Sequence, residues 1–267
     1  MGLHTHLRLW LQREGPDMIE FRGKSLTPAR LIWGSTAFLS AAISQGAWAQ
    51  ERVTPDVSGD VEVASDYRFR GYSRSQEEPV AQASLDATLP VGGSTSLFSG
   101  GIGSLTQGNP DYGSFQAQVY AGVEQQVGIF RLSLGGRGYL FPDLSAKDYF
   151  ELFGSGQTQL GPLSAKLGFA FAPDQRSYGG KRGVYVYSDL DAGVPGTPLT
   201  VATHLGWEDN ALFRDKLDWS LNLIYVRNPF SLSLGYVDTN RSAPFLEGGK
   251  LKNGADAALV VRLGAAF

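Results

Sequence analysis

A strict two-residue alternation over residues 57–70 is the feature that most constrains the fold. One set of alternate positions is free of charged side chains and ends in two aromatic residues, Tyr67 and Phe69. The other set carries five charged side chains: Asp60, Glu62, Asp66, Arg68 and Arg70. Successive side chains of a β-strand point to opposite faces, so this stretch predicts a strand with one apolar face and one polar face.

Such a strand suits either a soluble sandwich or a membrane barrel with lipid outside and water inside. An Arg or Lys that faces lipid near the middle of a membrane costs about 2–4 kcal/mol, and Asp or Glu costs less. A one-residue slip would turn all five charges outward, at a cost on the order of 10 kcal/mol. In a membrane the charged row must therefore face the interior. This strand alone leaves both fold classes open.

The N-terminal part has the pattern of a secretory signal. Lys24 and Arg30 precede an apolar run over residues 31–43, and Ala47 and Ala49 follow as a small-x-small cleavage pattern. We therefore expect residues 1–49 to be a signal peptide cleaved after Ala49, with Met18 as an alternative start. Without any cysteine in the chain, no disulfide and no lipid anchor on cysteine is expected. Cleavage would leave a net charge of about −5, which is not typical of a nucleic-acid-binding protein.

Residues 50–267 contain alternating segments and no apolar run near the roughly 18 residues of a membrane helix. Their lengths suit tilted membrane strands, of which about 9–11 residues cross a bilayer. Ten or fourteen strands are alternatives, because segment 95–104 is rich in glycine and serine. We expect twelve strands, at residues 57–70, 80–91, 95–104, 114–125, 129–140, 149–160, 163–172, 183–192, 199–208, 217–226, 230–237 and 255–267.

Short and long connections alternate along the whole chain. The short ones contain Gly or Pro and lie at residues 92–93, 127–128, 161–162, 193–198 and 227–229. The longer, polar ones lie at residues 71–79, 105–113, 141–148, 173–182, 209–216 and 238–254. An up-and-down membrane barrel has tight turns at one end and longer loops at the other, whereas a sandwich has no reason to alternate in this way. The sequence therefore predicts an all-β fold, a twelve-stranded antiparallel transmembrane barrel over residues 50–267, in the outer membrane of a Gram-negative bacterium.

Large aromatic residues fall near the strand ends on the apolar rows. Membrane barrels carry such girdles at both lipid–water interfaces. We expect these residues to form the girdles: Tyr67, Phe69, Trp207, Trp219, Tyr225, Phe230 and Phe267. The chain also ends on Phe267 at the close of an alternating strand. A terminal aromatic of this kind resembles the signal read by the barrel-assembly machinery of the outer membrane, which we expect as a partner beside membrane lipid.

The segment SDYRFRG at residues 65–71, with Ser73, Ser75, Pro79 and Gln82, resembles the opening motif of the TorF-like putative porins of Gram-negative bacteria. Segments 217–220 and 235–239 are similar to later motifs of that family. The resemblance covers essentially all of residues 50–267. It implies an outer-membrane barrel that acts as a porin without a settled substrate. Arg74 stands where the family pattern would lead us to expect glutamine.

A twelve-stranded barrel lies between the filled eight-stranded barrels and the open channels of sixteen to eighteen strands. We therefore expect a narrow, water-filled pore that passes small polar or charged solutes. The residues expected to line it are Asp60, Glu62, Asp66, Arg68, Arg70, Arg131, Arg137, Glu151, Asp189, His204 and Arg262. Arg68, Arg70 and Arg137 lie toward the external end, where they could attract small anions. Alternatively, the charges pair across neighbouring strands and only hold the wall together.

Two other classes of function remain open, a lipid-hydrolysing barrel enzyme and a structural or adhesive barrel that acts through its loops. A Ser–His hydrolase needs a base beside its nucleophile. His204 is the one histidine after residue 49, and it lies on a polar row. Residues 50–267 contain no Gly-x-Ser-x-Gly segment. We therefore expect no catalytic residue. With one histidine and no cysteine there, we also expect no metal site and no cofactor. The sequence does not indicate the solute or the oligomeric state.

Expression of the full chain in a Gram-negative host tests the cleavage site. N-terminal sequencing of the membrane-inserted form is expected to begin at Gln50. Ala47→Arg should block processing, because the cleavage pattern needs a small residue at this position. The control is Trp48→Arg, which adds the same charge between the two small residues and should still be cleaved. Normal processing of Ala47→Arg would contradict the assignment.

Overall fold

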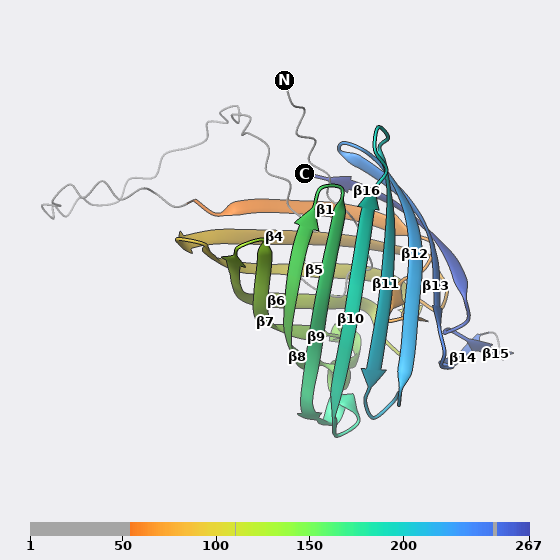
Figure 1. Cartoon of the computed structure of the whole chain (residues 1–267). Coiled ribbons are helices and arrows are strands. Elements are labelled where there is room, and N and C mark those ends of the chain that lie inside the picture. Colours follow the sequence, from red (N-terminus) through yellow and green to blue (C-terminus); the bar gives the residue numbers. More distant parts are fainter. Residues whose placement is uncertain (1–53, 110, 248–249) are drawn as a thin grey trace, which may run out of the picture.

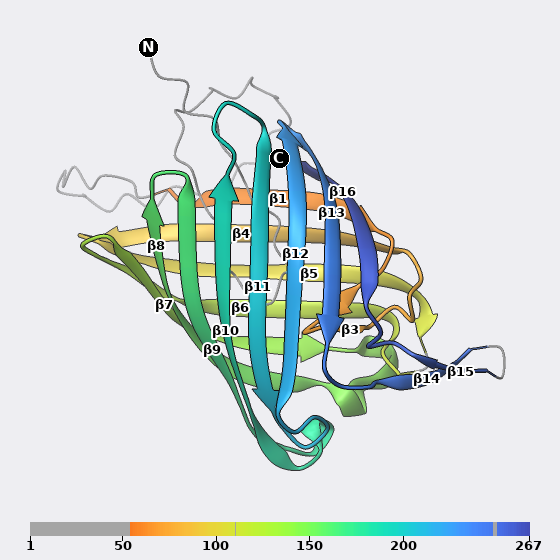
Figure 2. The same ribbon diagram turned by 45° about the vertical axis from the view of Figure 1, so that its right-hand side comes forward.

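Twelve long strands close into an antiparallel barrel (Figures 1 and 2). The structure is a computed structural model and describes residues 54–109, 111–247 and 250–267. The predicted signal peptide lies outside these residues. Around the barrel the strands follow the order β1-β16-β13-β12-β11-β10-β9-β8-β7-β6-β5-β4. The predicted fold class is confirmed.

Each segment expected as a strand contributes one strand to the barrel. The barrel strands are β1 (Asp56–Ala64), β4 (Val80–Gly92), β5 (Thr95–Asn109), β6 (Gly113–Val127), β7 (Phe130–Leu140), β8 (Tyr149–Leu160), β9 (Leu163–Gln175), β10 (Lys181–Gly193), β11 (Leu199–Asp209), β12 (Lys216–Arg227), β13 (Phe230–Thr239) and β16 (Ala258–Ala266). Outside the barrel ladder lie β2 (Arg68–Phe69), β3 (Tyr72–Ser73), β14 (Pro244–Glu247), β15 (Lys250–Asn253) and two 3₁₀ helices, η1 (Pro142–Lys147) and η2 (Arg176–Tyr178).

The two ends of the barrel differ as expected. One end, the turn end, holds the tight connections from β4 to β5, β6 to β7, β8 to β9 and β12 to β13, together with both ends of the barrel chain. The opposite end, the loop end, holds most of the longer connections. There β14 and β15 pair into a small hairpin that projects beyond the wall (Figures 1 and 2). The long loop predicted at residues 105–113 is wrong in extent, because β5 and β6 run on to Asn109 and from Gly113.

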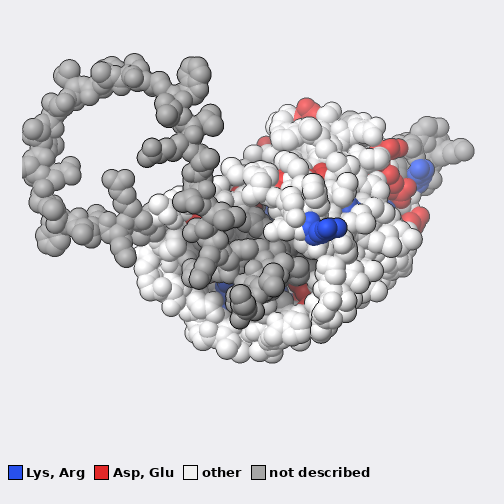
Figure 3. All heavy atoms as spheres, turned by 90° about the horizontal axis from the view of Figure 1, so that it is seen from above, with Lys and Arg blue, Asp and Glu red and all other residues white. Residues whose placement is uncertain are grey.

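The wall has an apolar outer face and a polar inner face. In β12, Lys216 and Asp218 are fully buried inside, whereas Leu217 between them exposes 40% of its surface outside. Leucine, valine and phenylalanine dominate the exposed residues of the other strands as well. The surface seen in Figure 3 is accordingly mostly uncharged over the wall, with charged side chains gathered in a few places. This is the distribution of a barrel surrounded by lipid.

The first strand ends earlier than its alternation predicts. β1 stops at Ala64, Ser65 still bonds to Val261 of β16, and from Asp66 on the chain leaves the barrel ladder and enters the interior. Tyr67 and Phe69 are buried there, with 7% and 2% of their surface exposed. Their assignment to an outer aromatic girdle is therefore wrong. Alternation continues through this segment because the chain forms a second, smaller hairpin with its own β-strands, β2 and β3.

The other aromatic residues expected in the girdles face outward. Trp207, Tyr225, Phe230 and Phe267 are among the exposed large apolar side chains, and Trp219 is half-buried on the outward row of β12. Trp207 and Trp219 lie near the loop end of β11 and β12, whereas the other three lie near the turn end. This placement agrees with two interfacial belts, although the belts themselves stay a prediction about the surrounding membrane.

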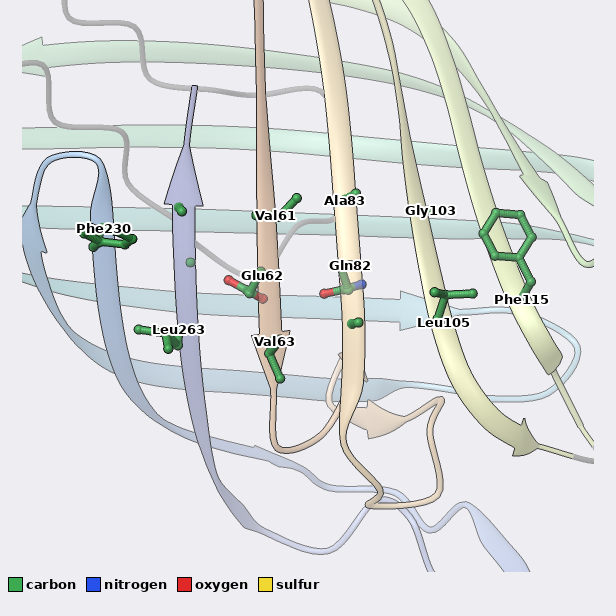
Figure 4. A pocket seen from close by; sticks show the side chains of 13 residues that line it. Val61, Glu62, Val63, Gln82, Ala83, Gly103, Leu105, Phe115, Phe230 and Leu263 are labelled. Carbon is green, nitrogen blue, oxygen red and sulfur yellow. The ribbon is translucent and has the colours of Figure 1, made fainter.

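A shallow apolar groove of about 530 Å³ crosses the outer face over β16, β1, β4 and β5. Figure 4 shows Ala83 and Gly103 on neighbouring strands of its floor, with Val63, Leu105 and Phe115 beside them. Small side chains make the recess, because large ones cover the wall elsewhere. The groove lies outside the barrel and is separate from the polar interior.

The seam between β1 and β16 closes the barrel. Five residue pairs join the two strands, from Asp60 with Ala266 to Ala64 with Arg262. The last residue extends this ladder: the Gly59 amide donates to the Phe267 carbonyl over 3.0 Å, and the Phe267 amide donates back over 2.9 Å. The Phe267 ring packs on Gly59, where a Cβ atom would lie 2.6 Å from the ring and 2.7 Å from the carbonyl oxygen of Ser84. Among the residues described, no helix has the length and apolar character needed to cross a membrane.

Substitution of Gly59 tests this seam. Gly59→Ala should destabilise the folded barrel by about 1–3 kcal/mol, because the new methyl group overlaps a backbone oxygen as well as a ring. The control is Gly138→Ala, whose Cβ would meet only Val119 at an ordinary 3.4 Å. The measurement is the temperature at which the heat-resistant electrophoretic form of the barrel is lost. If both variants lost the heat-resistant form at the same temperature, the tight fit at the seam would be contradicted.

Candidate functional site

Residues 66–75 form a hairpin inside the barrel, here called the inner hairpin. β2 and β3 pair through Arg68 with Ser73 and Phe69 with Tyr72. Arg70 and Gly71 form the two-residue turn between them, with positive φ angles of 47° and 86°. Positive φ at both central residues is the signature of a type I′ turn, whose twist matches that of paired strands. Every residue from 66 to 75 is buried, so the hairpin fills part of the lumen.

Asp66 ties the base of the inner hairpin together. Its Oδ1 accepts hydrogen bonds from the hydroxyl groups of Ser73, over 2.6 Å, and Ser75, over 2.9 Å. Its other carboxylate oxygen pairs with the Arg68 guanidinium. Arg68 in turn donates to the carbonyl oxygens of Gly254, over 3.0 Å, and Asp256, over 2.8 Å, which fixes the base to the chain just before β16. The aspartate and the two serines of the segment at 65–75 are thus structural parts of this hairpin.

Arg70, at the tip of the inner hairpin, lies between two wall carboxylates. Its Nη2 is 2.8 Å from Glu151 Oε2 on β8, and its Nη1 is 3.0 Å from Glu208 Oε1 on β11. The centre of the guanidinium lies 4.2 Å from the centre of the Tyr185 ring on β10. In the barrel order β8 and β11 lie on the side opposite β1, so the hairpin crosses the lumen. All three charged side chains are almost fully buried, with 3% or less exposed.

Two further contacts hold the tip against the wall. Lys216 on β12 donates to the Arg70 carbonyl over 2.5 Å and pairs with Glu208 over 2.6 Å. Gly71 presses on the neighbouring strands, since a Cβ atom there would lie 2.8 Å from the Cβ atoms of both Asp218 and Thr239. Only glycine combines this close approach with a φ of 86° at low cost. The tip is therefore fitted to one place on the wall.

Arg74 anchors the second strand of the inner hairpin in an aromatic cluster. Its guanidinium lies 3.3 Å from the centre of the Phe69 ring, and four more rings lie within 6 Å: those of Tyr72, Tyr112, Tyr139 and Phe141. Its Nη2 donates to the Tyr149 hydroxyl over 2.9 Å. Burial by itself lowers the pKa of Arg74, but the surrounding phenols, that of Tyr149 first, raise it well above its usual value. Arg74 is thus part of the hairpin's support.

Deeper in the lumen, His204 lies between two carboxylates. Its Nδ1 is 2.6 Å from Asp189 Oδ1 on β10, and its Nε2 is 3.1 Å from Asp218 Oδ1 on β12. The Tyr185 hydroxyl lies 2.7 Å from the same Nε2 and donates to Asp218 over 3.1 Å. Tyr185 therefore joins this group to the Arg70 site, because its ring contacts Arg70 and its hydroxyl contacts His204.

The remaining residues predicted to line the pore also face inward, and each has a polar or aromatic neighbour. Asp60 accepts a hydrogen bond from Ser84 on the adjacent strand. The other contacts are between Arg262 Nε and Glu62 at 3.8 Å, Arg131 Nε and Glu124 at 3.4 Å, and Arg137 Nη1 and the Tyr139 hydroxyl at 2.9 Å. These contacts favour the interpretation that the charges pair across the wall. They do not favour an anion-attracting cluster at Arg68 and Arg70, since both arginines meet carboxylates.

The inner hairpin itself is what sequence reasoning missed. Asp66, Arg68 and Arg70 lie in the interior as expected, but on a hairpin and not on the wall. The available signal was Arg70-Gly71 between Phe69 and Tyr72, a two-residue turn flanked by alternating residues. That signal is weak, because type I′ turns favour Asn-Gly or Asp-Gly, and arginine rarely has a positive φ. Lys216, Glu208 and Tyr185 could be placed at the tip only once the hairpin was known.

The part of the chain that the structure describes contains no group of three or more side chains suited to holding a metal ion. Both ring nitrogens of His204 lie close to carboxylates. A histidine that activates a serine must instead have one nitrogen near the hydroxyl group. The polar interior therefore has the chemistry of charge pairing and hydrogen bonding, and its arrangement does not favour the hydrolase alternative.

A family model described as "Bacterial protein of unknown function (Gcw_chp)" matches residues 49–267. The chain belongs to this family. The match starts one residue before the predicted mature N-terminus, Gln50, and covers the whole barrel, so the inner hairpin and its wall contacts lie within the family's domain. No match is found among curated protein sequences.

Among solved structures, the barrel is similar to the NanC porin, with a TM-score of 0.50 and 12% sequence identity, over 78% of this chain and 98% of that chain. It is also similar to the KdgM porin, with a TM-score of 0.49 and 11% identity, over 79% and 98% of the two chains. At these identities the likeness to NanC shows a shared fold. The closed antiparallel barrel of this family member is therefore a fold that it shares with the NanC porin.

Limited trypsin digestion tests the docking of the inner hairpin. In Gly71→Ala the added methyl group meets the wall at 2.8 Å in a backbone conformation that disfavours it. The hairpin should then undock, and cleavage at its arginines should be at least about tenfold faster, as loss of roughly 1.4 kcal/mol of docking free energy would give. The control is Gly128→Ala, where φ is also positive but nothing lies within 4 Å. Equal cleavage of the two variants would show that the hairpin does not depend on this contact.

Proposed function

We propose that this protein is an outer-membrane channel through which small polar or charged solutes diffuse passively. The observation that carries the proposal is the division of the barrel into an apolar outer face and a hydrogen-bonding, charged interior. A barrel whose interior served only to fill space would gain more from apolar packing than from buried charges, which cost free energy even when they are paired. The resemblance of the segment at 65–71 to TorF-like porins supports the same class of function.

The inner hairpin makes the channel narrow at the loop end. It crosses the lumen and occupies the space between β8 and β11 with the Arg70 side chain. Twelve strands give a barrel of intermediate width, in which one such hairpin obstructs a large part of the cross-section. The solutes that pass are therefore small, and the charged groups of both signs along the wall predict weak ion selectivity.

The two ends of the barrel suggest how it is oriented in the membrane. The chain ends of the barrel lie at the turn end, which we place on the periplasmic side, and the loop end then faces the exterior. The apolar wall contacts outer-membrane lipid. Phe267, which extends the closing seam, is the residue that we expect the barrel-assembly machinery to recognise. No step of this function calls for a cofactor or a catalytic residue.

Single-channel recording tests the proposal. The protein is produced as the full chain in a Gram-negative host, extracted from outer membranes and inserted into a planar lipid bilayer. Steady steps of current, linear in voltage, are expected, with a small reversal potential in a tenfold salt gradient. The control is the same preparation unfolded by boiling before insertion. A correctly folded, heat-modifiable barrel that never conducts would contradict the channel function, as would recovery of the protein in another cell fraction.

A further inference from the structure

The wall that receives Arg70 has the composition of a binding site for a guanidinium group. Glu151 and Glu208 supply two carboxylate oxygens from strands on either side, and Tyr185 supplies a ring face. Planar guanidinium suits this combination, because its fixed donors reach two acceptors while its face stacks on an aromatic ring. These three wall residues belong to the barrel, whereas Arg70 is delivered by a loop segment. The site is therefore separable from its present occupant.

The acidic side chains of the wall favour a cation at the position of the Arg70 guanidinium. On the wall, Lys216 pairs with Glu208, while Glu151 lies opposite Arg137 on β7 and accepts a hydrogen bond from the Tyr139 hydroxyl over 3.1 Å. Asp218 lies next to them and 3.8 Å from the same lysine. Removal of Arg70 without replacement would break two buried ion pairs and leave Glu151 and Glu208 each without a cationic partner that they have now, which is destabilising. A soluble cation of the same shape would avoid that cost.

We propose that the inner hairpin is a tethered ligand for an acidic and aromatic site on the barrel wall, and that small solutes bearing a guanidinium group displace Arg70 from it and open the loop end. This inference rests on the proposed channel function and names a class of solute for it. Arg70 competes as part of the same chain, and short tethers give effective concentrations in the millimolar range. Solutes are therefore needed at millimolar concentrations or above.

The way in which the inner hairpin is attached allows its tip to be displaced from the wall while its base stays in place. The tip is held by the Arg70 contacts, by Lys216 at the Arg70 carbonyl and by the packing of Gly71 on Thr239. The base is held separately, by Asp66 and by Arg68. A solute that takes over the contacts of the Arg70 side chain removes the ionic part of the tip's attachment, so that the tip is held only by Lys216 and by packing while the base stays attached. The moving part is short and faces the loop end.

Thiol labelling reports the position of the tip without relying on conductance. The chain has no cysteine, so a single introduced thiol is unique. Thr239→Cys places it under Gly71, at a buried position, and Ser242→Cys places it at an exposed position nearby. Modification by a charged maleimide is timed on the full-length protein in detergent, with L-arginine or with L-citrulline. Citrulline has the same shape as arginine but carries a neutral urea group.

Arginine at tens of millimolar should accelerate labelling of Thr239→Cys by on the order of tenfold, equivalent to one charge-assisted hydrogen bond, whereas citrulline should not. Labelling of Ser242→Cys should not change. With Arg70→Gln in the same background, labelling should already be fast and independent of arginine. The matched variant Arg227→Gln removes an exposed arginine at the turn end of β12, far from the tip, and should behave like the parent.

Conductance measured in the same solutions distinguishes a failure of the tethered-ligand inference from a failure of the proposed channel function. If arginine releases the tip and raises the conductance by a similar factor, both stand. If the barrel conducts but arginine and citrulline act alike on labelling, the tethered-ligand inference is wrong and the channel function is unaffected. If arginine alone releases the tip in a barrel that never conducts, the binding site stands and the channel function is wrong.

Discussion

A strand that crosses a lipid bilayer cannot leave its backbone N–H and C=O groups unpaired, and every other feature of this barrel depends on that constraint. The ladder must close, so β1 has to meet β16, and here it does so over five residue pairs extended by the amide and carbonyl of Phe267. Gly59 allows this extension because its missing side chain leaves room for the terminal ring. Closure also creates an interior that apolar lipid cannot enter, and the side chains of that interior are then free to be polar.

Polar interiors carry their own cost, since each buried charge needs a partner. At the loop end, the wall carboxylates Glu151 and Glu208 have partners from the inner hairpin as well as from the wall. The inner hairpin brings Arg70 to Glu151 and Glu208, and Arg74 to a cluster of aromatic rings. The hairpin is therefore part of the charge balance of the wall as well as an obstacle in the lumen. One segment thus both fills part of the lumen and completes the charge pairing of the wall.

The barrel could be predicted from the sequence because its constraints are local. Alternation fixes which side of a strand faces lipid, and Gly or Pro in short connections marks the turns, so the strands around Leu217 and Leu259 were placed correctly. The inner hairpin could not be predicted in this way. Tyr67 and Phe69 alternate like the strand before them, and nothing local distinguishes an aromatic residue that faces lipid from one that packs in a lumen. The difference lies in partners such as Tyr139 and Glu208, which come 70 to 140 residues later in the chain.

That separation in sequence has a consequence for assembly. The inner hairpin is among the first parts of the barrel domain to be synthesised, but Arg70 can meet Glu208 only when β11 is in place, 138 residues on. Contacts of such long range form late, because the intervening chain must first be ordered. A nascent barrel would therefore pass through a stage with a wide, water-filled interior and a loose first loop. By this reasoning the interior would narrow only after β11 has joined the wall, before or together with closure of the β1–β16 seam.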